Sequence, residues 1–178
     1  MNSLFKSGVA ARPTALRRRS LQALALSAVC FLMPNQALAL VQPAQAAIKT
    51  VVDFDATTWA PLLAKGPRPA AYVFTNTFCS TCPDAFEVLH KRVQGFAKPV
   101  TLAAVVMDVQ GDKALTHAHH YTGVTQIYAF DGFEPEIRQT VDPQWRNVTP
   151  YIVLISRTGT VQRVIGPPNG AQLNAWLR

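Results

Sequence analysis

Cys79 and Cys82 have two residues between them, in the run Phe78-Cys79-Ser80-Thr81-Cys82-Pro83. Two thiols at this spacing can form a disulfide and can also exchange it with another molecule. The attacking species in such an exchange is a thiolate, which the unpaired backbone N–H groups of a helix N-terminus stabilise. The two cysteines are therefore the residues whose types and spacing are best suited to chemistry, and that chemistry is thiol–disulfide exchange.

An apolar stretch precedes the cysteines and an amphipathic stretch follows them. Residues 70–75 form a continuous apolar run, which is typical of a strand buried on both faces. After Cys82, apolar residues recur at helical spacing and share one stripe with it, namely Ala85, Phe86, Leu89 and Val93. This pattern predicts that Cys79 stands at the start of a helix, open to solvent, and that Cys82 is turned toward the core.

The remaining pattern predicts an α/β fold. A second apolar run at 100–107 predicts a strand parallel to 70–75, joined to it by a right-handed crossover. The other expected elements are a polar helix at 112–121, a short strand at 127–130, a helical turn at 135–139, a hairpin at 151–155 and 161–165, and a last helix at 171–177. We expect one domain with a central mixed sheet flanked by helices.

Residues 1–46 have the composition of an export signal. They contain five basic residues and no acid, an apolar block at 21–33, and small residues up to Ala46. The apolar block is shorter than the roughly 20 residues that a membrane span requires. The pair Arg18-Arg19 also suits a twin-arginine signal, whereas a mitochondrial transit peptide is the alternative for an Arg-rich, acid-free leader. We expect a cleaved signal peptide at 1–46, a mature domain at 47–178 and a periplasmic location.

Removal of this leader changes both the charge and the cysteine count. The chain has 17 basic and 10 acidic residues, and the part after the leader has 12 and 10. A nearly neutral domain of this kind gives no indication of a nucleic-acid partner. Cys30 lies in the leader, so that Cys79 and Cys82 are the two cysteines of the mature chain. In an oxidising compartment two thiols this close are expected to be a disulfide unless they are kept reduced.

These features resemble the thioredoxin superfamily and, within it, the exported TlpA-like or ResA-like thiol–disulfide oxidoreductases. The resemblance runs from about Val51 to Leu177. It rests on an aromatic-C-x-x-C motif after a strand, on the run Trp145-Arg146-Asn147-Val148-Thr149-Pro150 before a strand, and on the closing hairpin and helix. It implies that Cys79 and Cys82 are catalytic, with Cys79 as the nucleophile and Cys82 as the resolving thiol.

The resemblance also implies substrate-binding residues and partners. In the family the Thr-Pro bond is cis and lies against the cysteine pair, so Thr149, Pro150 and Phe78 are expected to bind substrate, with the backbone of Thr149 facing an extended segment. A proline that merely starts a strand is the ordinary alternative. Protein partners such as apocytochrome c or copper-site cysteines are implied, with a membrane thiol carrier as electron donor. No cofactor or metal is implied, and we expect a monomer.

The sequence departs from the family pattern near the motif. Val73 stands six residues before Cys79, where typical thioredoxins have a buried acid, so proton transfer around Cys82 must use water or another group. The Ser80-Thr81 dipeptide is not the Gly-Pro of thioredoxin, and the redox potential therefore does not carry over. Asn76 stands where peroxiredoxins have a threonine, which weakens a peroxiredoxin interpretation.

Other functions of the same residues remain open. Soft thiolates favour Cu(I), so a copper chaperone is the alternative function, with His117, His119 and His120 as candidate ligands. Such a cluster is more often a solvated helix surface. A zinc site would need two further ligands and the chain has no second cysteine pair. A purely structural bridge across so short a loop would restrict the unfolded chain little.

Overall fold

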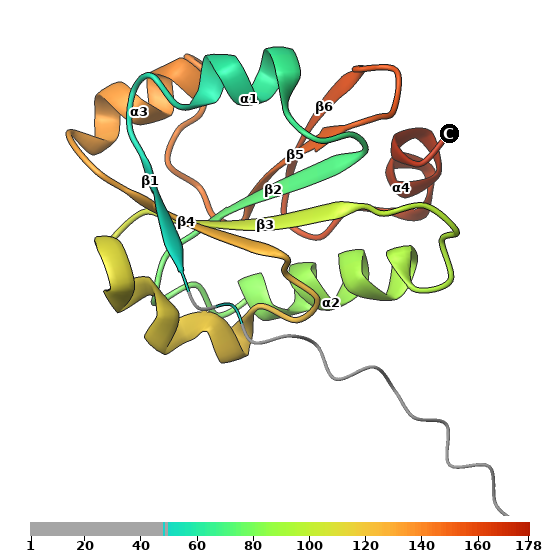
Figure 1. The fold of residues 1–178 in the computed structure, drawn as a ribbon, viewed down its shortest axis with the longest axis horizontal. Helices are drawn as coiled ribbons and strands as arrows, with labels where there is room; N and C mark the ends of the chain where they lie inside the picture. Colours follow the sequence, from blue (N-terminus) through green and yellow to red (C-terminus); the bar gives the residue numbers. More distant parts are fainter. Residues whose placement is uncertain (1–47, 49) are drawn as a thin grey trace, which may run out of the picture. The chain divides into compact units, whose positions relative to one another are not determined.

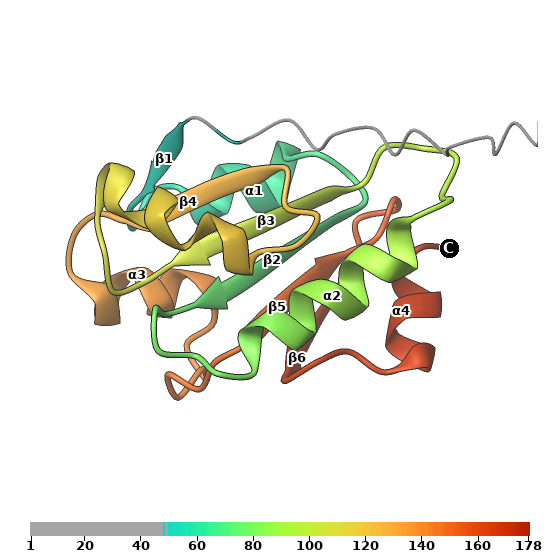
Figure 2. The same cartoon turned by 90° about the horizontal axis from the view of Figure 1, so that it is seen from below.

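The computed structural model describes residue 48 and residues 50–178, which form a six-stranded sheet with helices on both faces (Figure 1, Figure 2). The strands are β1 (Val51–Phe54), β2 (Ala70–Thr75), β3 (Thr101–Val106), β4 (Gln126–Phe130), β5 (Tyr151–Ile155) and β6 (Val161–Ile165). The helices are α1 (Trp59–Lys65), α2 (Cys82–Val93), the 3-10 helix η1 (Gly111–His120), α3 (Glu134–Val141) and α4 (Gly170–Trp176). The predicted signal peptide at 1–46 lies outside the described residues.

The sheet is mixed, with the strand order β1-β4-β3-β2-β5-β6. Strands β1, β4, β3 and β2 run parallel to their neighbours, whereas β5 is antiparallel to β2 and β6 is antiparallel to β5. Strand β2 is thus central, with Tyr72 opposite Ala103 on one side and Val153 on the other. The predicted α/β architecture with a central mixed sheet is confirmed. None of the described helices is long and apolar enough to span a membrane.

Two apolar layers cover the sheet because successive side chains of β2 point to opposite faces. Ala71 and Val73 pack in the layer of α2, η1 and α4, and Tyr72 and Phe74 pack in the layer of α1 and α3. Both faces of β2 are fully buried, which is why its sequence is apolar throughout. Each large side chain buried in this way contributes about 1.5–3 kcal/mol to stability. The central strand is therefore a rigid base for the loop that follows Thr75.

The segment at 111–120 is helical, as the sequence predicts for 112–121. It is the 3-10 helix η1, in which Ala114 is the one buried residue. Most helical stability comes from the packing of an apolar face, and this segment has little of it. In addition, the hydroxyl of Thr116 donates to the carbonyl of Lys113 and so competes for a backbone acceptor. The other elements agree with the predicted ones to within a few residues at their ends.

Candidate active site

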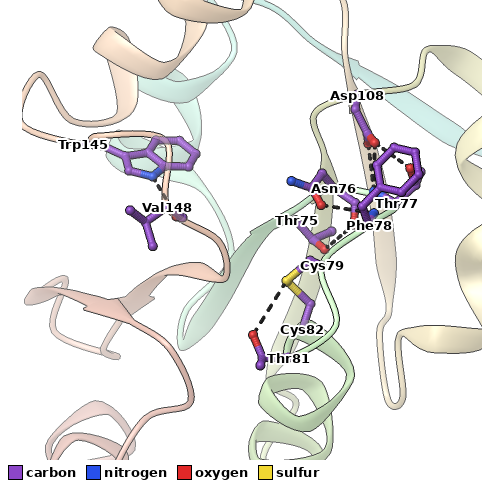
Figure 3. The surroundings of a disulfide bond; sticks show 10 residues. All are labelled: Thr75, Asn76, Thr77, Phe78, Cys79, Thr81, Cys82, Asp108, Trp145 and Val148. Carbon is purple, nitrogen blue, oxygen red and sulfur yellow. Dashed lines mark hydrogen bonds between the residues drawn. A yellow bond between two sulfur atoms is a disulfide. The ribbon is translucent and has the colours of Figure 1, made fainter.

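A disulfide joins Cys79 and Cys82 at the carboxyl end of β2 (Figure 3). Strand β2 ends at Thr75 and α2 begins at Cys82, so that Cys79 lies in the connecting loop, three residues before the helix. Cys82 is 1% exposed and belongs to the core, whereas Cys79 is half-buried. The inward position of Cys82 agrees with the predicted helical stripe. Cys79 was expected at the start of the helix and open to solvent, and it lies instead half-buried in the loop, three residues before α2.

Hydrogen bonds between neighbouring residues shape the loop between β2 and α2. The backbone N–H of Cys79 donates to the carbonyl of Asn76 at 3.2 Å, and the N–H of Phe78 donates to the Asn76 side chain at 3.1 Å. Asp108, just after β3, accepts hydrogen bonds from Thr77 and so ties the loop to the neighbouring strand. As a result Phe78 is turned outward and is 91% exposed. An exposed aromatic ring next to Cys79 in the chain offers an apolar contact to a partner.

A second loop, at residues 145–150, approaches the same end of the sheet. Its Thr149–Pro150 bond is cis, the geometry that the resemblance predicted. Pro150 directly precedes Tyr151, which pairs with Phe74 of β2, so it lies beside the strand end that leads to the cysteines. In Figure 3, Trp145 and Val148 lie on one side of the disulfide, with Thr77 and Asp108 on the other.

Aromatic packing holds this second loop in place. The ring of Trp145 stacks on Tyr151 with 4.4 Å between ring centroids, and its Nε1–H donates to the carbonyl of Val148 at 3.0 Å. Arg138 of α3 donates to the carbonyl of Trp145 at 3.3 Å. Thr149 is half-buried, Pro150 is buried and Val148 is 44% exposed. The loop therefore presents an apolar side chain and peptide groups at a fixed position near the disulfide.

A hollow of about 220 Å³ adjoins the disulfide. Both cysteines line this hollow. His117 and His120 of η1 also line it, as does Tyr121, the residue that follows η1. The hydroxyl of Tyr121 is buried and has no hydrogen-bond partner among the described residues. Burial, together with the charge of Asp108, raises the pKa of this hydroxyl to about 12. Tyr121 is therefore a neutral donor near neutral pH.

Sequence reasoning missed this arrangement of η1 against the cysteine loop. His117 and His120 were considered as possible metal ligands or as surface residues, and the 3-10 helix places them beside the cysteines. His119 does not line the hollow. Within the described part of the chain, no three His, Cys, Asp or Glu side chains are grouped so as to hold a metal ion. The histidines meet the cysteines because η1 follows β3, the cysteine loop follows β2, and these two strands are paired in parallel. This pairing is a long-range feature.

No family model matches the chain, and no curated protein sequence matches it. Among solved structures it is similar to a secreted disulfide oxidoreductase of Mycobacterium tuberculosis homologous to E. coli DsbE, with 17% identity over 61% of this chain and 76% of that one (TM-score 0.41). It is similar to a thioredoxin-related protein from Neisseria meningitidis serogroup B, with 18% identity over 62% and 83% (TM-score 0.48). It is also similar to StoA from Bacillus subtilis, with 16% identity over 61% and 81% (TM-score 0.42).

The fold itself is recognised from its connectivity. A parallel strand–helix–strand unit, β2-α2-β3, has the disulfide at its first junction. An antiparallel hairpin, β5-β6, joins β2 on the other side directly after a cis-proline, and a helix closes the chain. This chain accordingly has the thioredoxin-like fold.

Proposed function

We propose that this protein is an exported thiol–disulfide oxidoreductase that exchanges disulfides with partner proteins, and that it works as a reductase. The observation that carries the proposal is the Cys79–Cys82 disulfide after β2, with one cysteine half-buried in a loop and the other 1% exposed. An attacking thiol must reach a partner, whereas a resolving thiol must be kept from other reactions. The difference in burial between the two cysteines supports this division of roles.

The reaction begins with the reduced protein and an oxidised partner. The Cys79 thiolate attacks one sulfur of the partner disulfide, so that a mixed disulfide forms and the other partner sulfur leaves as a thiolate. Cys82 then attacks Cys79 Sγ, which forms the Cys79–Cys82 disulfide and breaks the bond to the partner. The partner gains two electrons and the cysteine pair loses them, while the proton of the Cys82 thiol passes to a departing partner thiolate. A membrane thiol carrier is proposed to return the electrons.

The exposed residues around Cys79 support binding of a polypeptide. Phe78 and Val148 are exposed apolar side chains contributed by the two loops at this end of the sheet. We propose that Phe78 packs on the partner and that Thr149, with Pro150, offers backbone groups to an extended segment, as in strand addition. Cysteine-containing segments of apocytochrome c or of copper-site proteins are the proposed partners, and the protein is proposed to act as a monomer.

The location follows from the predicted leader. We propose that residues 1–46 direct export to the periplasm and are removed there, leaving residues 47–178. In that oxidising compartment a reductase needs a dedicated electron supply, because the disulfide is otherwise the stable form. This requirement is the reason for including a membrane thiol carrier in the proposal.

The experiment uses a disulfide-bonded model protein and the reduced full chain, with Cys30→Ser present in every protein compared. We expect the Cys79→Ser variant to lose disulfide exchange and the Cys82→Ser variant to stop at the mixed disulfide. Ser80→Ala, which keeps both thiols, serves as the control and retains activity. Retained exchange in Cys79→Ser would end this assignment.

The alternative, Cu(I) binding by the two thiolates of the reduced protein, predicts a different result. A copper chaperone would take one equivalent of Cu(I) from a weak chelator and keep it. Under the redox proposal, catalytic turnover with the model protein proceeds in the presence of an excess of a copper chelator. Loss of turnover on chelation would favour the copper function.

A further inference from the structure

Val73 leaves the resolving thiol without the buried carboxylate that typical thioredoxins place there. It is fully buried and belongs to the same apolar cluster as Cys82. We propose that His117 and His120 exchange protons with Cys82 through the hollow beside the disulfide. This inference rests on the proposed function, because it concerns the step in which Cys82 releases the partner.

The hollow connects the buried sulfur with the two imidazoles. Cys82, His117 and His120 all line it, and the two imidazole rings are stacked with 6.4 Å between their centroids. A water molecule needs only about 10–15 Å³ of such space, and the hollow of about 220 Å³ therefore holds several. A chain of water molecules between thiol and imidazole is thus sterically possible although Cys82 is closed to bulk solvent.

Tyr121 adds an unpartnered polar group to the residues that line the hollow. Its side chain is 5% exposed, its ring packs on Phe86 with 4.9 Å between centroids, and its hydroxyl has no partner among the described residues. Buried hydroxyls are almost always hydrogen-bonded, to protein or to ordered water. A water molecule in the hollow would satisfy this hydroxyl and would be oriented by it.

The other charged and titratable groups near the hollow are unsuited to this role. Among its lining residues only the two cysteines, the two histidines and Tyr121 titrate. Tyr121 has a pKa raised to about 12 by burial and by the charge of Asp108, so it does not accept a proton near neutral pH. Asp108 lies behind the loop and is engaged by Thr77. Imidazole is the side chain that ordinarily changes charge between pH 5 and 8.

The proposed step conserves atoms and charge. In the mixed disulfide, the proton on Cys82 Sγ passes through water to an imidazole of His117 or His120. The Cys82 thiolate attacks Cys79 Sγ, the Cys79–Cys82 bond forms, and the bond between Cys79 and the partner breaks. The partner leaves as a thiolate and takes the proton from the imidazolium, so that the histidine returns to its neutral form.

The test separates the two attacks with the chromogenic disulfide DTNB and the reduced full chain carrying Cys30→Ser, in which Cys79 and Cys82 are the two thiols. Attack by Cys79 releases the first coloured thiolate, and attack by Cys82 on the mixed disulfide releases the second. We expect the double variant His117→Gln, His120→Gln to slow the second release by about 10²-fold at pH 7, the lower end of a general-base contribution. We expect the first release to keep its wild-type rate.

The pH profile and a matched control identify a proton-transfer role. Because an imidazole base would take the Cys82 proton without the help of hydroxide, the second release in the wild type is expected to depend only weakly on pH above pH 7. In the double variant it is expected to rise about tenfold per pH unit up to the pKa of the thiol. His90→Gln, on α2 and outside the hollow lining, where the ring pairs with Gln94, is expected to keep the wild-type profile.

Rescue by added imidazole distinguishes a loss of proton transfer from a loss of structure. Added imidazole is expected to restore the second release in the variant His117→Ala, His120→Ala and to leave the wild type unchanged. An unaltered second release and pH profile in both double variants would overturn the inference while leaving the proposed function intact. A failure of the proposed function would instead appear in the first release, as retained exchange by Cys79→Ser.

Discussion

The carboxylate of Asp108 accepts hydrogen bonds from both the backbone N–H of Thr77, at 2.9 Å, and its hydroxyl, at 2.6 Å. Thirty-one residues separate the two in the chain. They meet because β3, which Asp108 follows closely, pairs in parallel with β2, which Thr77 follows. The loop that carries Cys79 is therefore fixed at its start by the neighbouring strand.

Removal of this anchor is expected to loosen the loop. The variant Asp108→Ala should lower the free energy of unfolding by about 1 kcal/mol, since an exposed hydrogen bond has a small net value. Asp108→Asn keeps one acceptor and should lose less. Urea unfolding of the oxidised protein measures both, with Asp112→Ala, an exposed acid at the start of η1, as the control. Equal unfolding midpoints for Asp108→Ala and the control would contradict the anchoring role.

The indole of Trp145 is expected to matter for substrate binding. Trp145→Phe removes the Nε1–H donor to the Val148 carbonyl and leaves a ring to stack on Tyr151. We expect a KM for the model protein several-fold higher at nearly unchanged kcat, because the loop before Pro150 then holds the partner less firmly. Steady-state kinetics of disulfide reduction provide the measurement.

The control is a second replacement of tryptophan by phenylalanine, Trp176→Phe. Trp176 also donates from Nε1, to the carbonyls of Ala70 and Ile155, and it packs in the core of the opposite face. Trp176→Phe should reduce stability by about 1–3 kcal/mol, the cost of leaving buried acceptors unpaired, without raising KM. A higher KM in Trp176→Phe and not in Trp145→Phe would refute the role of the loop at 145–150 in substrate binding.

Asp142 is expected to make stability depend on pH. Burial raises its pKa, but hydrogen bonds from Tyr151 and Gln144 and the nearby charge of Arg163 outweigh burial, so the pKa lies below its ordinary value. A lowered pKa in the folded state stabilises the protein above the unfolded value of about 3.9, and this stabilisation is lost as the pH falls through the folded value.

The comparison with Asp142→Asn isolates this charge. At pH 7 the variant should be less stable than the wild type, and the difference should shrink as the pH falls below about 4, where the unfolded carboxyl is protonated. Thermal unfolding at several pH values gives the result. A difference that is constant across this range would show that the charge of Asp142 has no part in stability.

Trapping is expected to identify the natural partner. In Cys82→Ala the mixed disulfide on Cys79 cannot be resolved within the molecule, so it accumulates. Non-reducing electrophoresis of the exported fraction should show adducts that disappear on reduction. The double variant Cys79→Ala, Cys82→Ala should show none. Adducts of equal abundance in the double variant would mean that another residue forms them.

Local patterns in the sequence were sufficient for most of the fold. The strand at 70–75 was predicted with the bounds it has, because a strand buried on both faces must be apolar at every position. The inward position of Cys82 followed from helical spacing alone. Which other residues lie close to the end of β2 depends on the order of strands in the sheet, and no local sequence pattern shows that order. For this reason neither the Asp108 anchor nor the wall formed by His117 and His120 was foreseen.

The reactivity of Cys79 tests the account most directly. The reduced double variant Cys30→Ser, Cys82→Ala leaves Cys79 as the only thiol of the sequence, and its rate of alkylation across a pH series gives the thiol pKa. We expect a pKa at least about one unit below the free-cysteine value of 8.5, because Cys79 lies just ahead of the N-terminus of α2, where the helix dipole favours a negative charge. A pKa of about 8.5 or above would contradict the role of Cys79 as the attacking thiolate.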